Sequence, residues 1–189
     1  MEKKVAVVAI GGNSLIKDSK HTSTADQYLA AKETAFHIVD MIESGWDVVV
    51  GHGNGPQVGF ILQKAEIAYG AIGLPMAGLD VCGAQSQGQI GYALAQNLQN
   101  ELKRRGINKP VASVIEQTVV DRNDPAFSNP TKPIGGFMTE AEAKKRKAEE
   151  GWTVIEDAGR GWRRVVASPI PQEIAVGRSE ERRVGKECR

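Results

Sequence analysis

The sequence has little cysteine, little net charge and no long apolar run. Two cysteines in 189 residues are too few for a disulfide framework or a cysteine metal site, so a cytoplasmic location is expected. Basic residues number 24 and acidic residues 23, and this balance argues against nucleic acid or an acidic membrane as a partner. Apolar stretches such as Val5–Ile10 are far shorter than the about 20 residues of a membrane-spanning helix. The N-terminus also lacks the pattern of a secretory signal.

Glycine is the one abundant residue type of structural interest. The chain has 21 glycines, and many of them cluster in its first part. Gly11-Gly12 follows the apolar run Lys4–Ala9, and Gly51–Gly55 follows the apolar run Trp46–Val50. Glycine lets a backbone approach a ligand closely, so these two loops are the first candidates for a binding site.

Residues 1–120 alternate strand and helix patterns. Near-continuous apolar runs predict buried strands, and apolar residues spaced three or four apart predict helices. The pattern predicts an α/β fold with a mostly parallel open sheet and helices on both faces. The expected elements are strands at Lys4–Ala9, Trp46–Val50 and Val111–Val120, and helices at Ala25–Ser44, from Pro56, and at Asp80–Arg105. Their expected buried stripes are Leu29, Phe36, Val39 and Ile42 in the first helix, and Ile90, Leu94, Leu98 and Leu102 in the long one.

The pattern changes after residue 120. Residues 121–168 predict a small α+β subdomain, with a short helix between Thr139 and Gly151 and a hairpin of Trp152–Glu156 with Trp162–Ala167. Residues 169–177 are expected to return to the main sheet. Residues 178–189 read as a non-native tail, with a native exposed tail as the alternative.

The two glycine loops each contain an asparagine and each end a predicted strand. Adjacent parallel strands place such loops at the same edge of a sheet, where backbone N–H groups form an anion nest. One loop would hold a transferring phosphoryl group and the other a small planar acceptor; two tight turns without a ligand are the alternative. Neither loop matches a P-loop or a dinucleotide fingerprint.

A cation is needed beside transferring phosphate, and Lys132 is the candidate. It lies between Pro130 and Pro133 in a stretch predicted to be an irregular loop, where prolines restrict its direction. A solvated loop lysine is the alternative. His52 lies between two glycines and is more readily a spacer than a general base.

Five segments together resemble the carbamate kinases of the amino-acid kinase superfamily. They are VVAIGGN (7–13), GHGNGPQVG (51–59), LDVCGAQSQGQIGY (79–92), DPAFSNPTKPIG (124–135) and SPIPQEI (168–174). The likeness extends from the N-terminus to about residue 176. The glycine-rich first loop alone occurs across the superfamily, whereas GHGNGPQVG combined with NPTKPIG is specific to carbamate kinases.

The resemblance implies reversible phosphoryl transfer between ATP and carbamate, which gives carbamoyl phosphate and ADP, with Mg²⁺ bridging the phosphates. It implies a homodimer, with the 80–105 helix contributing to its contact, and no metal ligand from the protein is assigned. By motif match, Gly11, Gly12 and Asn13 cradle the transferring group, and the two glycines also serve the nucleotide phosphates. Gly53, Asn54 and Gly55 bind carbamate or carbamoyl phosphate, while Lys132 replaces a lysine that other superfamily members carry at the position of Ala9.

Length is the main departure from the family. Carbamate kinases run to roughly 300 residues, and the half that carries the adenine pocket has no counterpart here. The chain is therefore expected to be an acceptor-binding part that is inactive by itself. The alternatives are a non-catalytic module that binds anions or carbamoyl phosphate, and a related amino-acid kinase with another acceptor.

Overall fold

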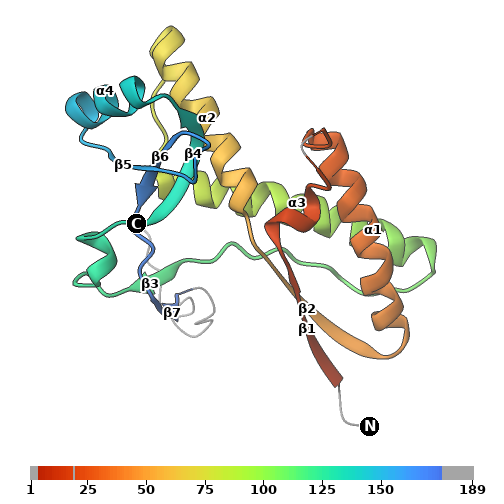
Figure 1. The fold of residues 1–189 in the computed structure, drawn as a ribbon. Coiled ribbons are helices and arrows are strands. Elements are labelled where there is room, and N and C mark those ends of the chain that lie inside the picture. The colour runs from red at the N-terminus through yellow and green to blue at the C-terminus, as the bar shows by residue number, and fades with distance from the viewer. Residues whose placement is uncertain (1–3, 19, 176–189) are drawn as a thin grey trace, which may run out of the picture. The chain divides into compact units, whose positions relative to one another are not determined.

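A computed structural model describes residues 4–18 and 20–175, so the predicted tail at 178–189 lies outside the described residues (Figure 1). The chain divides into two units, Met1–Val114 and Ile115–Arg189. The first contains β1 (Lys4–Ile10), η1 (Gly12–Leu15), α1 (Thr24–Glu43), β2 (Trp46–His52), α2 (Gly55–Ile72) and α3 (Leu79–Arg104). The second contains β3 (Thr118–Val120), η2 (Pro125–Phe127), β4 (Lys132–Met138), α4 (Glu140–Glu150), β5 (Thr153–Glu156), β6 (Trp162–Val166) and β7 (Pro171–Ile174).

Strands β1 and β2 form a parallel pair in the first unit, in register from Lys4 opposite Trp46 to Ile10 opposite His52. Side chains alternate between the two faces of this pair. On one face Val8, Val48 and Val50 pack against the helical core. On the opposite face, Val5, Val7 and Val49 are exposed.

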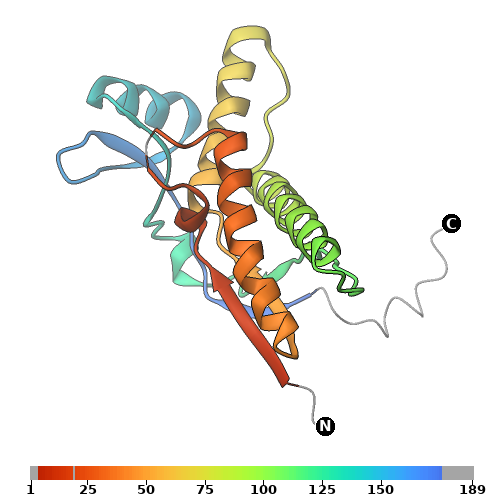
Figure 2. The same ribbon diagram turned by 90° about the vertical axis from the view of Figure 1, so that its right-hand side faces the viewer.

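Helices α1 and α3 lie side by side against that packed face (Figure 2). Ser23 caps α1, because its Oγ accepts from the amide of Asp26 while the Asp26 carboxylate accepts from the amide of Ser23. The expected stripe is wrong in part, since Leu29 and Phe36 are exposed. The buried face consists instead of small and branched residues that let α3 approach closely: Ala30, Ala31, Ala35, Ile38 and Val39.

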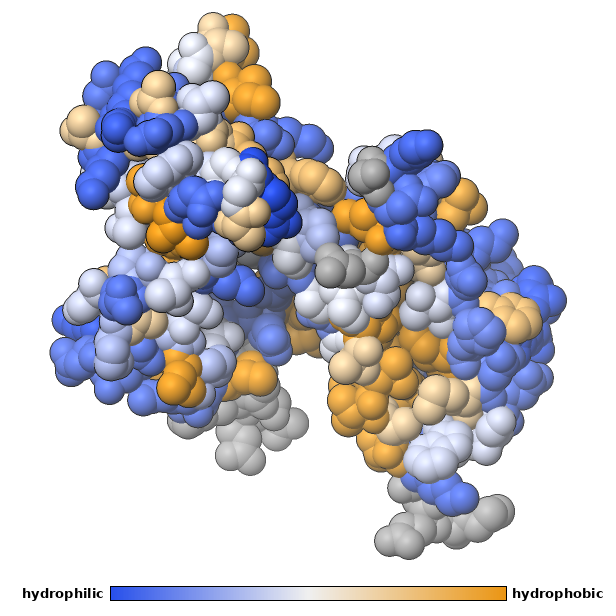
Figure 3. Space-filling model, in the orientation of Figure 1, coloured by the Kyte–Doolittle hydropathy of each residue, from blue (hydrophilic) through white to orange (hydrophobic). Residues whose placement is uncertain are grey.

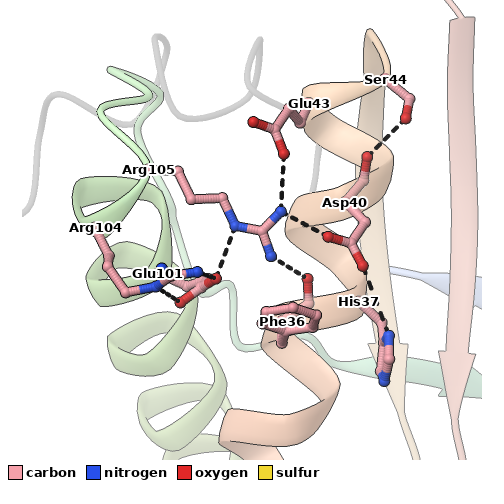
Figure 4. A network of polar contacts seen from close by, with 8 residues as sticks. All are labelled: Phe36, His37, Asp40, Glu43, Ser44, Glu101, Arg104 and Arg105. Carbon is pink, nitrogen blue, oxygen red and sulfur yellow. Dashed lines mark hydrogen bonds and ion pairs between the residues drawn. The ribbon is translucent and has the colours of Figure 1, made fainter.

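Helix α3 follows its sequence pattern closely. The predicted stripe of Ile90, Leu94, Leu98 and Leu102 is buried. Gly106 ends the helix with a φ of +71°, a conformation that favours glycine. Arg105, at the C-cap, donates hydrogen bonds to Asp40, Glu43 and Glu101, and also to the carbonyl of Phe36 (Figure 4). The ends of α1 and α3 are therefore joined by one guanidinium group.

The α/β class is confirmed, but the expected open sheet is not formed by the described residues. They form three small sheets, of which only β1–β2 is parallel. The third predicted strand is reduced to Thr118–Val120, and it pairs antiparallel with β7. An apolar run indicates a strand without specifying its partner, because pairing depends on residues far away in the sequence. Within the first unit, α1 and α3 pack on one face of the β1–β2 pair, so these residues show the α/β class without helices on both faces.

The second unit contains a three-stranded antiparallel sheet in the order β4-β6-β5. Its hairpin and its short helix agree with expectation, and Thr139 caps α4 by accepting from the amide of Glu142. Lys132 is the first residue of β4, so the prediction of an irregular loop there is wrong. Pro133 is compatible with this strand because β4 lies at the edge of its sheet, where a missing N–H group costs no ladder bond. Within residues 4–18 and 20–175, no helix combines the length and apolarity needed to cross a bilayer.

Candidate active site

The two glycine loops meet at the carboxyl ends of β1 and β2. The amide of Gly53 donates to the carbonyl of Ile10 at 2.8 Å. A Cβ atom added to Gly12 would lie 2.8 Å from the amide nitrogen of Gly55 and 3.1 Å from that of Asn54. A Cβ atom added to Gly53 would lie 3.1 Å from the nitrogen of Gly12. The loops touch through their backbones, which confirms the prediction that they share one edge and explains why both need glycine.

The amino end of α2 adds donors at the same place. The helix begins at Gly55, and its first intrahelical bond runs from the amide of Val58 to the carbonyl of Asn54 at 2.9 Å. The amides of Gly55 and Gln57 precede that bond, where helical N–H groups have no carbonyl in their own helix to pair with. The positive end of the helix dipole therefore lies beside the Gly12 backbone, an arrangement suited to an anion.

Asn54 is oriented by a residue of α3. Its Nδ2 donates to the Ser86 hydroxyl at 2.7 Å, and Ser86 donates in turn to the carbonyl of Gly83 at 2.6 Å. Ser86 is fully buried. The side-chain amide of Asn54, at the start of α2, is therefore fixed by the Ser86 hydroxyl. Because this hydroxyl is buried, a ligand that enters from solvent does not compete for the bond.

Gln57 fixes the first glycine loop through a hydrogen bond from its side-chain amide. It is 1% exposed, and its Nε2 lies 3.3 Å from the carbonyl of Gly12 and 3.4 Å from Oε1 of Gln27, to which it donates. Gln27 donates to the carbonyl of Thr22 at 3.0 Å. This chain of amides connects the Gly12 loop to the entry of α1. A cavity of about 300 Å³ between α1, α2 and α3 borders it, with Gln27 and Gln57 in its wall.

Sequence reasoning missed Ser86, Gln27 and Gln57. Ser86 and Gln57 stand inside segments that carry the family resemblance, but a serine or glutamine in a helix is usually a solvated residue. These residues are recognised by their burial and by their hydrogen bonds to or near a glycine loop, and both features are visible only in the folded chain.

The remaining candidates lie in different places. Gly11 and Gly12 are in the first loop as expected, while the side chain of Asn13 lies outside the described part of the structure. Lys132 belongs to the second unit, and its association with the loops stays a prediction. His52 Nδ1 lies 3.2 Å from the carbonyl oxygen of the adjacent Gly53. Cys82 is fully buried, and burial raises the pKa of its thiol, so it is a packed side chain.

Acidic metal ligands do not gather at this site. Within the described ranges, no group of three or more His, Cys, Asp or Glu side chains could hold a metal ion. The polar groups around the two glycine loops are backbone amides, side-chain amides and a hydroxyl. They are suited to orienting a small anion.

Parallel strands that end in two touching glycine loops, beside a helix N-terminus, give this chain the α/β class and a site whose backbone donors are suited to an anion. It is 51% identical over 170 residues to a carbamate kinase of Thermococcus kodakarensis, a match that covers 89% of this chain and 54% of that relative. A carbamate kinase-like protein of Escherichia coli is 54% identical over 175 residues, which cover 92% of this chain and 54% of the relative.

Among solved structures, carbamate kinase from Giardia lamblia bound to AMP-PNP matches with a TM-score of 0.79 at 43% identity, over 92% of this chain and 54% of that one. No family model matches the chain. The chain is a carbamate kinase homologue and corresponds to the N-terminal part of such an enzyme. It spans about half the length of the relatives it matches.

Proposed function

We propose that this chain is the acceptor-binding part of a carbamate kinase, which transfers a phosphoryl group reversibly between ATP and carbamate to give carbamoyl phosphate and ADP. The observation that carries the proposal is the backbone contact between Gly12 and the Gly53–Gly55 loop. Two donor-rich loops in contact can hold the two ends of one small molecule, the phosphoryl group and the carbamoyl group.

Each loop has its own task in this proposal. Gly53, Asn54 and Gly55 orient the carbamate carboxylate, and the first loop of Gly11, Gly12 and Asn13 receives the phosphoryl group. Phosphoryl transfer depends mainly on positioning and on neutralising charge on the phosphoryl oxygens. Preorganised amides supply part of that neutralisation, and the Lys132 ammonium supplies a further part. Ser86 and Gln57 keep the two loops in place through Asn54 and the Gly12 carbonyl.

The nucleotide belongs to the other part of the proposed enzyme. The Giardia relative is bound to AMP-PNP, and we assign ATP or ADP with Mg²⁺ to this enzyme as well. When bound, Mg²⁺ would neutralise charge on the nucleotide phosphates, and we assign its site, like that of the nucleotide, to the other part of the enzyme, since the described residues of this chain form no acidic cluster. The adenine pocket is assigned to the half that this chain does not match, which would also complete a mostly parallel sheet with helices on both faces.

A homodimer in the cytoplasm completes the proposal. Its contact is assigned in part to α3, where Leu79, Val81 and Tyr92 are exposed by 36%, 45% and 61%. Exposed apolar side chains on one helix are a feature of surfaces that associate.

The test is calorimetry with carbamoyl phosphate, paired with a coupled assay for ATP formation from ADP. We expect binding of carbamoyl phosphate in preference to inorganic phosphate, without turnover by this chain alone. Failure to bind carbamoyl phosphate contradicts the proposal. Turnover by these residues would place a nucleotide site within them and contradict the assignment to an acceptor-binding half. The same two measurements are made on a longer protein that contains this chain and the second half, which we call the parental enzyme. If it binds carbamoyl phosphate but forms no ATP, the non-catalytic binding module is favoured.

A kinase with another acceptor is the second candidate, and one relative favours it because it is named only as carbamate kinase-like. A substrate panel on the parental enzyme separates the two candidates. Phosphorylation of an amino-acid carboxylate with no reaction of carbamate would favour this second candidate.

A further inference from the structure

The cavity of about 300 Å³ between α1, α2 and α3 lies outside the two glycine loops, and all of its lining residues belong to the first unit. Ligand pockets in proteins measure about 300 to 1,000 Å³, so this one has room for a small molecule. Figure 3 shows apolar surface along the second half of α2, where Ile67 is 64% exposed. We call it the α2 cavity, because five of its lining residues follow one face of that helix: Gln57, Phe60, Ile61, Lys64 and Ile67.

The wall of the α2 cavity contains a side-chain oxygen without a partner. Nε2 of Gln27 donates to the carbonyl of Thr22, which leaves Oε1 of Gln27 to accept from Gln57. Nε2 of Gln57 therefore faces Gln27 and the carbonyl of Gly12, and the amide has no other nitrogen. Oε1 of Gln57 is buried and has no hydrogen-bond partner within the described residues. A buried oxygen in this state destabilises the fold until a donor reaches it.

A cation lies further along the same face of α2. Among the described residues that line the cavity, Lys64 is the one that carries a charge. Seven residues at about 1.5 Å each place it about 10 Å from Gln57 along the helix axis. Helical side chains lean towards the N-terminus of their helix, which for Lys64 is the direction of Gln57. The cavity therefore presents an acceptor, then the apolar Phe60 and Ile61, and then a cation.

We infer that the α2 cavity binds a short aliphatic carboxylic acid that carries an N–H donor at its other end. The donor pairs with Oε1 of Gln57, and the carboxylate pairs with the ammonium of Lys64. The methylene chain between them contacts Phe60 and Ile61. An acid without the donor leaves Gln57 unpaired, and an amine without the carboxylate leaves Lys64 unpaired, so both ends are needed for full affinity.

Occupancy of the α2 cavity also reaches the first glycine loop, and this part of the inference rests on the proposed function. A donor on Oε1 of Gln57 polarises its amide, because hydrogen bonds in a chain strengthen one another. Nε2 then donates more strongly to the carbonyl of Gly12, which fixes the loop that we assign to the phosphoryl group. A ligand in the cavity should therefore lower the Kd of carbamoyl phosphate, by about fivefold if the coupling is typical of linked sites.

Calorimetry with 5-aminopentanoate on the full 189-residue chain tests the cavity without carbamoyl phosphate. We expect one saturable site per chain. Pentanoate and pentylamine each lack one end of the probe and should bind about tenfold more weakly. Lys64→Gln should weaken binding of 5-aminopentanoate about tenfold and leave pentylamine unaffected. Lys103→Gln is the matched control, because Lys103 is exposed on α3 and does not line the cavity.

NMR of the side-chain amides tests the contact with Gln57 directly. The Nε2 resonances of Gln57 should shift when 5-aminopentanoate is added. Those of Gln96 should stay in place, because Gln96 is exposed on α3 and is paired with the hydroxyl of Tyr92. Calorimetry with carbamoyl phosphate, in the absence and presence of saturating 5-aminopentanoate, then measures the coupling between the two sites.

Four outcomes overturn the inference. They are absence of binding by 5-aminopentanoate, equal binding of pentanoate or pentylamine, equal affinity of Lys64→Gln and the wild type, and a carbamoyl phosphate affinity that the probe does not change. If the chain binds no carbamoyl phosphate at all, the proposed function fails. The probe alone still tests the cavity in that case, so the two failures are distinguishable.

Discussion

The side-chain amide of Asn54 donates to the hydroxyl of Ser86 at 2.7 Å, although 32 residues separate the two in the sequence. This bond connects the second glycine loop to the buried face of α3, to which Ser86 belongs. The loop that we assign to the acceptor is therefore positioned by a buried helix and not by its own sequence alone.

Ser86→Ala should weaken carbamoyl phosphate binding while leaving the fold intact. Loss of one hydrogen bond to a buried partner costs about 1 kcal/mol, or roughly fivefold in Kd. Calorimetry measures the affinity and circular dichroism the fold. Ser44→Ala is the control, because Ser44 makes a comparable bond to the carbonyl of Asp40 at the far end of α1. Equal affinity in the two variants would contradict a positioning role for Ser86.

Gly12→Ala should separate the two loops. Its Cβ would lie 2.8 Å from the backbone nitrogen of Gly55, and backbone cannot move aside as a flexible side chain does. We expect a loss of about 1 to 3 kcal/mol in unfolding free energy, as for other overpacked sites, together with loss of carbamoyl phosphate binding.

Gly59→Ala is the matched control for that variant. Nothing lies within 4 Å of a Cβ at this helical position, so alanine should stabilise α2 slightly. Urea denaturation measures both variants. Wild-type affinity in Gly12→Ala would show that close contact of the loops is not needed for binding.

Lys132→Ala should weaken carbamoyl phosphate binding by removing the proposed cation. A hydrogen bond that involves a charged group contributes about 1.5 to 3 kcal/mol, which corresponds to roughly ten- to a hundredfold in Kd. The wild-type affinity should also fall with added salt more steeply than that of the variant. Lys144→Ala is the control, because Lys144 is exposed on α4 and paired with Glu140. If both variants bind alike, Lys132 is only a solvated lysine at a strand end.

Glu101→Gln should reduce the free energy of unfolding near neutral pH. It should also make that free energy depend less on pH in the acidic range. Hydrogen bonds from Arg104 and Arg105 lower the pKa of the Glu101 carboxyl from its ordinary 4.5 to about 2. Because the folded-state pKa is depressed, protonation favours the unfolded chain. The stabilisation is therefore complete above about pH 4.5 and is lost as the pH falls towards 2.

Thermal melts between pH 7 and pH 2 measure this effect. Glu43→Gln is the control within the same network, since Glu43 is 58% exposed and Arg105 keeps its bonds to Asp40 and Glu101. Exposed ion pairs contribute little, so the control should change Tm less. A Glu101→Gln profile parallel to that of the wild type would contradict the assignment.

Local signals in the sequence were enough for most elements of the first unit. The stripe from Ile90 to Leu102 predicted the buried face of α3. The two glycine loops were also predictable, because each follows an apolar run and needs backbone freedom. These features depend on neighbours within a few residues, where spacing and steric freedom decide the outcome.

Nonlocal contacts decided the rest. Alanines form the buried face of α1 because α3 packs there, which left Leu29 and Phe36 exposed. Strand β3 pairs with β7, more than 50 residues away, and no local pattern specifies that choice.

For the candidate site, the sequence by itself determined the residues that could form two anion-binding loops and the family that they resemble. The tertiary structure decided that the loops touch, and that Ser86 and Gln57 support them from within the core. The physical reason is range: backbone freedom belongs to single residues, whereas burial and hydrogen-bond partners exist only after distant segments have packed together.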